Sequence, residues 1–110
     1  MKSDMERLKR QEKVRTILEK ANQTLAKFLD IDTAFLRDLV AEDVITDEQR
    51  DIIKTIQING EQVDELLKII KVTTGAYDGF MRLLSRPKTK DLYDYIKDLE
   101  EKVDLPNQGM

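Results

Sequence analysis

The sequence predicts an all-α protein, a compact antiparallel bundle of six helices. Apolar residues recur every three or four positions along most of the 110 residues, which is the spacing of one face of an α-helix. Helix start signals separate these segments, and the chain has only two prolines and four glycines. Helices of about 10–16 residues with short connections favour antiparallel neighbours.

The composition is that of a small soluble domain. Hydrophobic residues make up 40% and charged residues 37% of the chain, which is too apolar for a disordered protein. No apolar run approaches the ~18 residues that a membrane span needs, and no signal-peptide pattern opens the sequence. The chain has no cysteine, which agrees with a reducing compartment. We therefore expect a cytoplasmic domain without membrane contact.

Charge is distributed unevenly along the chain. Residues 1–29 carry eight basic and four acidic side chains, a net of +4, whereas residues 30–58 carry three and eight, a net of −5. A basic first helix therefore adjoins an acidic second and third helix. The net charge of −3 argues against nucleic acid as a partner, because phosphate binding needs a basic surface.

The first helix has an apolar side and a basic side. Its apolar residues between Val14 and Leu29, Phe28 among them, share one stripe. Lysines line the opposite side, including Lys20 and Lys27. Such a row is usually a solvated face, and a binding surface is the alternative.

Polar residues mark where the next three helices begin. Asp32 or Thr33 can cap the second helix. Thr46 and Gln49 form a capping box that opens the third helix, and residues 59–62 have the same box spacing at the start of the fourth.

The third helix separates isoleucines from carboxylates. At about 100° per residue, Ile52, Ile53 and Ile56 share one side. Asp47 and Asp51 lie on the other side. We therefore expect the three isoleucines to face the bundle.

The last helices follow the same logic. Gly79 lies inside the fifth helix, where it lowers helix propensity by about 1 kcal/mol relative to alanine and suggests close packing. Pro87 ends this helix, and the sixth begins near Thr89. The predicted regions are a charged extension or first-helix start at 1–13, the six-helix domain at 14–103, and a C-terminal tail or linker at 104–110.

The acidic residues of the second and third helices do not form a recognisable catalytic or metal motif. The chain has no histidine and no cysteine, and no Gly-rich phosphate loop accompanies the carboxylates. The aspartates near Asp32 lack the spacing and the glycine of an EF-hand. We expect no enzyme activity, cofactor or metal. These acidic residues either stabilise helix ends or form a docking surface for a basic partner.

Two stretches have an order and separation of apolar residues found in a known family. They are Phe35-Leu36-x-x-Leu39 followed by Val44-Ile45-Thr46-Asp47-Glu48-Gln49 and Ile52-Ile53, and then Leu66-Leu67-x-Ile69-Ile70 followed by Gly75-Ala76-Tyr77-x-x-Phe80-x-x-Leu83-Leu84. They resemble the second to fifth helices of the caspase recruitment domain (CARD). The resemblance covers residues 17–99 and depends on the motifs taken together.

The resemblance implies a six-helix antiparallel Greek-key bundle, the death fold, without catalytic activity. Such domains bind other CARD-containing proteins (caspases, sensors or adaptors) and themselves, in apoptotic, inflammasome and innate immune signalling, often as helical assemblies. A basic surface on the first and fourth helices meets an acidic surface on the second and third. By position, the acidic side is Asp38, Glu42, Asp43, Asp47, Glu48 and Asp51, and the basic side is Lys20, Lys27, Lys68 and Lys71.

Other functions stay open from the sequence. The related death effector domain is one alternative, although its Arg-x-Asp-Leu signature is missing from the sixth helix. A generic helical adaptor with an unrelated partner is another. A helix-turn-helix protein would present Asp47, Glu48 and Asp51 where DNA favours arginine or lysine.

Overall fold

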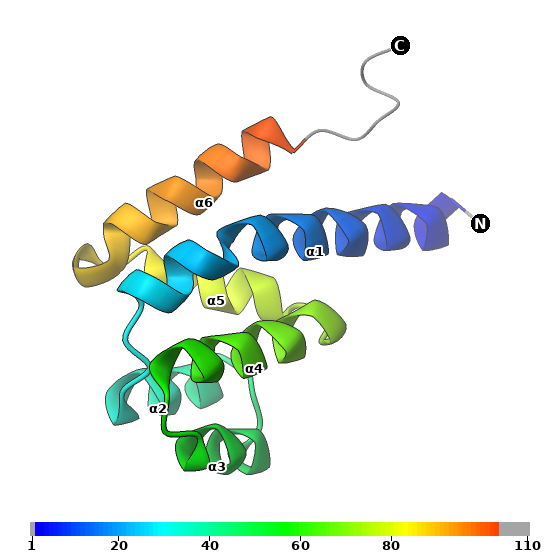
Figure 1. Ribbon diagram of the computed structural model, residues 1–110. Coiled ribbons are helices and arrows are strands. Elements are labelled where there is room, and N and C mark those ends of the chain that lie inside the picture. Colours follow the sequence, from blue (N-terminus) through cyan, green and yellow to red (C-terminus); the bar gives the residue numbers. More distant parts are fainter. Residues whose placement is uncertain (1, 104–110) are drawn as a thin grey trace.

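The computed structural model describes the backbone of residues 2–103 and the side chains of residues 9–103. Within that range the chain folds into six α-helices and one 3₁₀ turn (Figure 1). In chain order they are α1 (Lys2–Phe28), α2 (Thr33–Ala41), α3 (Asp47–Thr55), α4 (Asn59–Val72), α5 (Ala76–Leu84), η1 (Pro87–Thr89) and α6 (Lys90–Lys102). The predicted all-helical bundle is confirmed. The tail predicted at 104–110 lies outside the described residues.

The longest helix, α1, lies across one side of the bundle. It packs most extensively on α4 and also contacts α6. Helix α2 contacts α3 and α5, and α3 contacts α4. Figure 1 shows α4 between α1 and α3, and α6 on the other side of α1. Helix α3 therefore lies at one edge of the molecule, and α4 separates it from α1.

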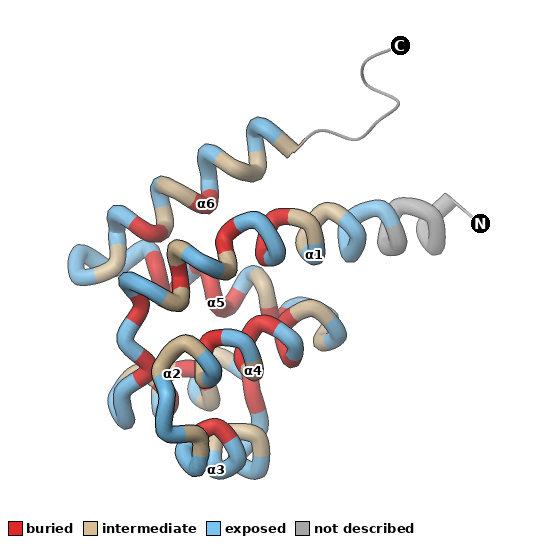
Figure 2. The backbone as a smooth tube through the Cα atoms, viewed as in Figure 1, coloured by how far each residue is buried: buried red, intermediate tan, exposed pale blue. Residues whose placement is uncertain are grey.

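The core is apolar. The inward faces of the helices supply its buried side chains (Figure 2). The largest of them, Phe80 on α5, is fully buried. No polar or charged side chain between residues 9 and 103 is buried. Burial of aliphatic and aromatic surface therefore holds the helices together.

Two residues predicted to be in the core lie outside it. Phe28 is 69% exposed, because the chain turns away after the last turn of α1 and Leu29 and Ile31 enter the core instead. Ile52 is 56% exposed, because α3 lies at the edge of the bundle and buries only Ile53 fully.

Two predicted helix starts are confirmed. The Gln49 N–H donates to the Thr46 hydroxyl oxygen at 3.1 Å, and the Thr46 N–H donates to the Gln49 side chain at 2.8 Å. This capping box fixes the first turn of α3. Asp32 caps α2 by accepting from the Phe35 N–H at 2.8 Å.

The capping box predicted at residues 59–62 is wrong. Asn59 is already the first residue of α4, and its side chain binds the end of α1 instead. Its amide donates to the carbonyl oxygens of Ala26 at 3.3 Å and Leu29 at 2.8 Å, and its carbonyl oxygen accepts from the Ile31 N–H at 3.0 Å. Carbonyl groups at a helix end lack partners within the helix, and Asn59 supplies them here.

The predicted close packing at Gly79 is confirmed. A Cβ atom at this position would lie 2.9 Å from both the Glu42 carbonyl oxygen and Val44 Cγ2. The backbone of α5 therefore contacts the segment between α2 and α3 directly. By contrast, a Cβ atom at Gly60 would lie 3.7 Å from Ala26 Cβ, an ordinary contact distance.

We predict that Gly79→Ala destabilises the protein by about 1–3 kcal/mol, because the added methyl group overpacks the contact with the segment between α2 and α3. Gly60→Ala is the matched control. It should leave the free energy of unfolding unchanged or raise it by up to about 1 kcal/mol through helix propensity. Chemical denaturation of both variants tests this. Equal stability of the two would contradict the close approach at Gly79.

Candidate protein–protein interface

The exposed acids of α3 form one surface, which we call the α3 acidic surface: Asp47, Glu48 and Asp51. All three side chains are exposed, and the first two lie in the first turn of the helix, where the helix dipole favours carboxylates. Arg50 lies 3.0 Å from Asp47 and 3.3 Å from Asp51. This surface therefore keeps a net negative charge at the edge of the bundle.

The acids predicted on α2 are used differently. The Arg86 guanidinium lies 2.7 Å from the Asp38 carboxylate, and the Arg82 guanidinium lies 3.0 Å from the Glu42 carboxylate. These ion pairs join α2 to α5 and the turn that follows it. Asp43, just after α2, is exposed and adopts a left-handed backbone with φ of 60°. The six predicted acids therefore do not form one surface.

The predicted lysines lie on neighbouring helices in different surroundings. Lys20 and Lys27 are exposed on the outer side of α1. On α4, Lys68 lies 4.0 Å from Glu65. The Lys71 side chain is only 21% exposed and lies 3.9 Å from Glu19 across the α1–α4 contact. Of the four lysines, Lys20, Lys27 and Lys68 are exposed and available to a partner, and Lys71 is not.

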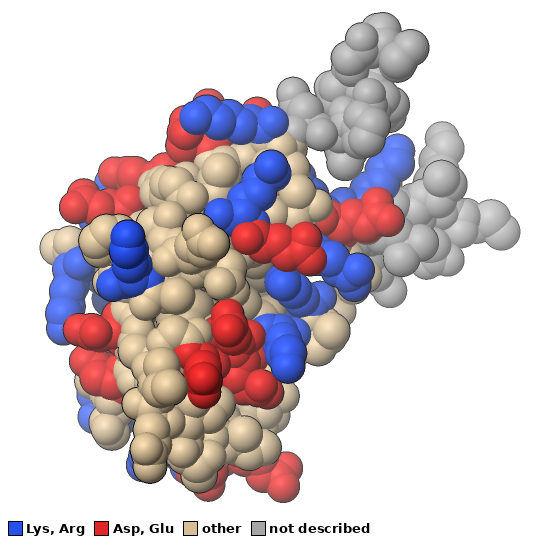
Figure 3. All heavy atoms as spheres, viewed as in Figure 1, with Lys and Arg blue, Asp and Glu red and all other residues tan. Residues whose placement is uncertain are grey.

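Acidic side chains interrupt the predicted basic surface. Glu61 and Asp64 are exposed on α4, and Figure 3 shows acids gathered over α4 between the lysines of this face. The α1–α4 face is therefore mixed in charge, with lysines on both helices and acids between them.

A shallow hollow of about 580 Å³ lies between the end of α1 and the start of α4, and sequence analysis did not predict it. Phe28 and Ile58 are exposed in it, and Lys27 lines its α1 side. The one feature of the sequence that could have indicated this hollow is Ile58, an apolar residue in the connection between two helices. Whether such a residue is exposed depends on the angle between those helices.

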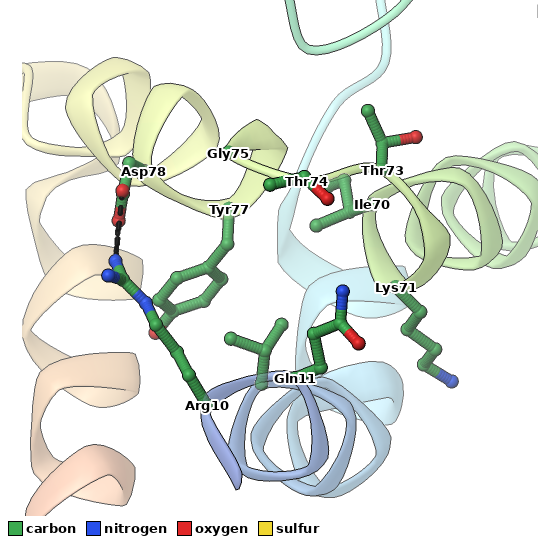
Figure 4. Close-up of a pocket in the computed structure, with 10 residues that line it drawn as sticks. Arg10, Gln11, Ile70, Lys71, Thr73, Thr74, Gly75, Tyr77 and Asp78 are labelled. Carbon is green, nitrogen blue, oxygen red and sulfur yellow. Dashed lines mark hydrogen bonds and ion pairs between the residues drawn. The ribbon is translucent and has the colours of Figure 1, made fainter. Parts of the chain in front are cut away.

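A second hollow of about 540 Å³ lies between α1, the end of α4 and the start of α5 (Figure 4). Arg10 closes one side by binding both carboxylate oxygens of Asp78 at 2.9 Å. Tyr77 projects between these helices, with the aliphatic Val14 and Ile70 on the wall. The charged groups of this hollow already form ion pairs within the chain. The pair between Arg10 and Asp78 therefore stabilises the packing of α5 on α1.

Tyr77 also joins α5 to α6. Its hydroxyl donates a hydrogen bond to the Glu100 carboxylate, whose other oxygen lies 3.0 Å from the Lys97 amine. Burial, and then the hydrogen bond to Glu100, raise the pKa of Tyr77. Burial alone would raise the pKa of Glu100, but the hydrogen bonds from Tyr77 and Lys97 outweigh it and lower that pKa.

Comparisons of the chain with protein-family models, curated proteins and solved structures give no match. Within residues 2–103, no helix combines the length and apolar character needed to cross a bilayer. In the same part of the chain, no group of three or more acidic side chains is arranged to hold a metal ion. Function is therefore inferred from the chain's own surfaces.

We predict that Tyr77→Phe lowers stability most near neutral pH. Because the folded pKa of Glu100 lies below its ordinary value of 4.5, its carboxylate stabilises the fold above that value and loses this effect as pH falls. Losing a hydrogen bond to a charged group should reduce the free energy of unfolding by about 1–3 kcal/mol at pH 7. The loss should be smaller near about pH 3.

The matched control for this prediction is Tyr95→Phe. Tyr95 is half-buried on α6, and its hydroxyl makes no hydrogen bond among the described residues. Urea denaturation at several pH values should show a pH-dependent loss for the first variant only. A loss independent of pH would contradict the coupling between Tyr77 and Glu100.

Proposed function

We propose that this chain is a non-catalytic interaction module of the CARD type, which binds domains of its own fold. The residue pattern between positions 17 and 99 supports this, and the six-helix bundle agrees with it. In this proposal the helices follow the Greek-key order of the death fold. The partners are CARD-containing sensors, adaptors or caspases of apoptotic or inflammatory signalling in the cytoplasm.

One observation carries the proposal: opposite charges are exposed on two helices of the bundle that another helix separates. The α3 acidic surface lies at one edge of the bundle, and Lys20 and Lys27 lie on α1, with α4 between the two helices. These charges do not neutralise each other within one chain. They can meet between two chains, where each surface finds its complement.

Only some of the residues implied by the family resemblance are available to contact a partner. Asp38 and Glu42 are engaged with arginines of their own chain, so they contribute little to a partner. Lys71 is half-buried against Glu19. We therefore assign the contact to the α3 acidic surface on one chain and to the exposed Lys20, Lys27 and Lys68 on the other.

The strength of such a contact depends on several charges acting together. An exposed ion pair contributes only ~0–1 kcal/mol, so a single pair would not hold two domains. Several pairs, repeated across an assembly, raise the overall avidity. Salt also screens the electrostatic attraction between exposed charges on the two chains.

We predict that Asp51→Lys and Lys20→Glu each weaken association by roughly 5- to 30-fold, because each reversal replaces attraction by repulsion worth about 1–2 kcal/mol. Mixing the two variants pairs the reversed charges and should recover part of the binding. Raising salt from about 0.05 to 0.5 M should weaken wild-type association, since the Debye length shrinks from roughly 14 to 4 Å. Sedimentation velocity measures all three effects.

The matched control for the charge reversals is Asp91→Lys. Asp91 is an exposed acid in the first turn of α6, so this variant makes the same change in net charge as Asp51→Lys, away from the proposed contact. It should bind as the wild type does. If Asp91→Lys weakened association as much as Asp51→Lys, net charge rather than a specific contact would be responsible. Association unaffected by any reversal or by salt would point instead to a helical adaptor with another surface.

A further inference from the structure

The connection between α4 and α5 carries an exposed hydroxyl group that the fold does not use. Nine serine and threonine side chains lie between residues 9 and 103. Six of their hydroxyl groups take part in a hydrogen bond, namely those of Thr16, Thr46, Thr55, Thr73, Ser85 and Thr89. Within this part of the chain the hydroxyl groups of Thr24, Thr33 and Thr74 make no such bond.

Of these three side chains, Thr74 is the one that lies outside a helix. Thr24 is half-buried within α1, and Thr33 is the first residue of α2. Thr74 is exposed in the short connection between Val72 and Ala76. An enzyme that modifies a side chain must bind the backbone around it, and exposed loops open at the lowest free-energy cost.

The end of α4 before this loop is weakly held. Ile70 is buried, but Val72 is 77% exposed. The Lys71 amine lies 3.9 Å from the Glu19 carboxylate, and a long, partly exposed ion pair of this kind is weak. The chain beyond Ile70 can therefore leave the helix and extend across the surface of an enzyme.

Positive charge surrounds the Thr74 hydroxyl group. Lys71 precedes it by three positions. Figure 4 shows Thr74 on the loop, with Arg10 on one side of the same hollow and Lys71 on the other. Among the described residues, one carboxylate lines this hollow, that of Asp78. Arginine and lysine are the usual partners of a phosphate group in proteins.

The other exposed hydroxyl group has the opposite surroundings. Thr33 follows Asp30 and Asp32, whose exposed carboxylates repel a phosphate group. Exposure alone therefore does not separate Thr33 from Thr74, but exposure, loop position and charge together do.

We propose that Thr74 is a phosphorylation site for a protein kinase that selects a basic residue three positions before its acceptor. The Oγ1 atom of Thr74 forms a bond to the γ-phosphorus of ATP, and the bond between that phosphorus and the β–γ bridging oxygen breaks. ADP leaves, and the hydroxyl proton passes to the carboxylate base of the kinase. The inference does not depend on the proposed function, because it uses only this loop and its surroundings.

The phosphate group changes the ion pairs of the hollow. Arg10 now binds both carboxylate oxygens of Asp78 at 2.9 Å. A phosphate group at pH 7 carries a charge of about −1.5 to −2 and offers arginine the same two-pronged contact as a carboxylate. Arg10 therefore turns from Asp78 to the phosphate group, and Lys71 leaves Glu19 for it. The modified loop then connects the start of α5 to α1.

Phosphorylation of the purified chain tests the site. The probe is Mg-ATP with the catalytic subunit of cyclic-AMP-dependent protein kinase and, separately, with protein kinase C, two enzymes that favour basic residues near the acceptor. Mass spectrometry of proteolytic fragments should place phosphate on Thr74 and none on Thr33. No phosphate on Thr74 with either enzyme, or equal rates at the two threonines, would overturn the proposal.

A pair of lysine variants tests how the acceptor is selected. Lys71→Gln should slow phosphorylation of Thr74 at least about fivefold, because the kinase loses its basic contact. Lys54→Gln is the matched control, since Lys54 is exposed on α3 and the charge change is the same. It should leave the rate within about twofold of the wild type. Equal rates for the two variants would overturn the role of Lys71, and circular dichroism confirms that both are folded.

Phosphorus NMR of the modified chain tests the surroundings of the phosphate group. The second pKa of a phosphothreonine is ordinarily about 6, and neighbouring cations lower it because they stabilise the dianion. This pKa should be lower in the folded chain than in the same chain unfolded in urea. Arg10→Gln should raise it toward the unfolded value, and Lys54→Gln should leave it unchanged. The same pKa in the folded and unfolded chains would overturn the contact with Arg10 and Lys71.

Discussion

The side-chain amide of Asn59 joins the end of α1 to the start of α4, and the shape of the exposed surface depends on this junction. The amide group binds two carbonyl oxygens at the end of α1 and the Ile31 N–H beyond it. The chain must therefore turn at Leu29, which enters the core, while Phe28 is left outside. The same junction holds Ile58 beside Phe28. A single polar side chain thus determines which apolar residues are covered and which are exposed.

Acidic residues that are close in sequence serve two different purposes in this fold. Those of α2 hold α5 in place through Arg82 and Arg86, beside the close contact at Gly79. Those of α3 project from the edge of the bundle. Pairing within the chain lowers the charge of the α2 side and leaves α3 as the acidic edge. A cluster of acids in the sequence therefore becomes a directional surface only through the arginines that the fold places beside some of them.

Local patterns predicted the helices and two of their caps because periodicity and capping involve residues within a few positions of one another. The Thr46–Gln49 box and the Asp32 cap are of this kind. The choice between Ile52 and Ile53 depends on the rotation of α3 against its neighbours, which a helical period alone does not fix. The partner of Glu42 lies 40 residues away in the sequence. Of the candidate surface, the α3 acids and the α1 lysines could be predicted as charged faces, whereas the hollow beside them depends on where two distant helices meet.

Among residues 9–103, the core contains no buried polar or charged side chain, and this affects how the sequence can change over time. Aliphatic residues of similar volume replace one another in such a core at small cost, so most interior positions are free to drift. The positions under strict constraint are few and lie at the edges of packing, such as Gly79, where only a hydrogen atom fits. Two descendants of one ancestor could therefore keep this architecture while retaining little identity in their interiors. The residues that stay identical between them would be glycines and helix caps rather than the hydrophobic residues that hold the fold together.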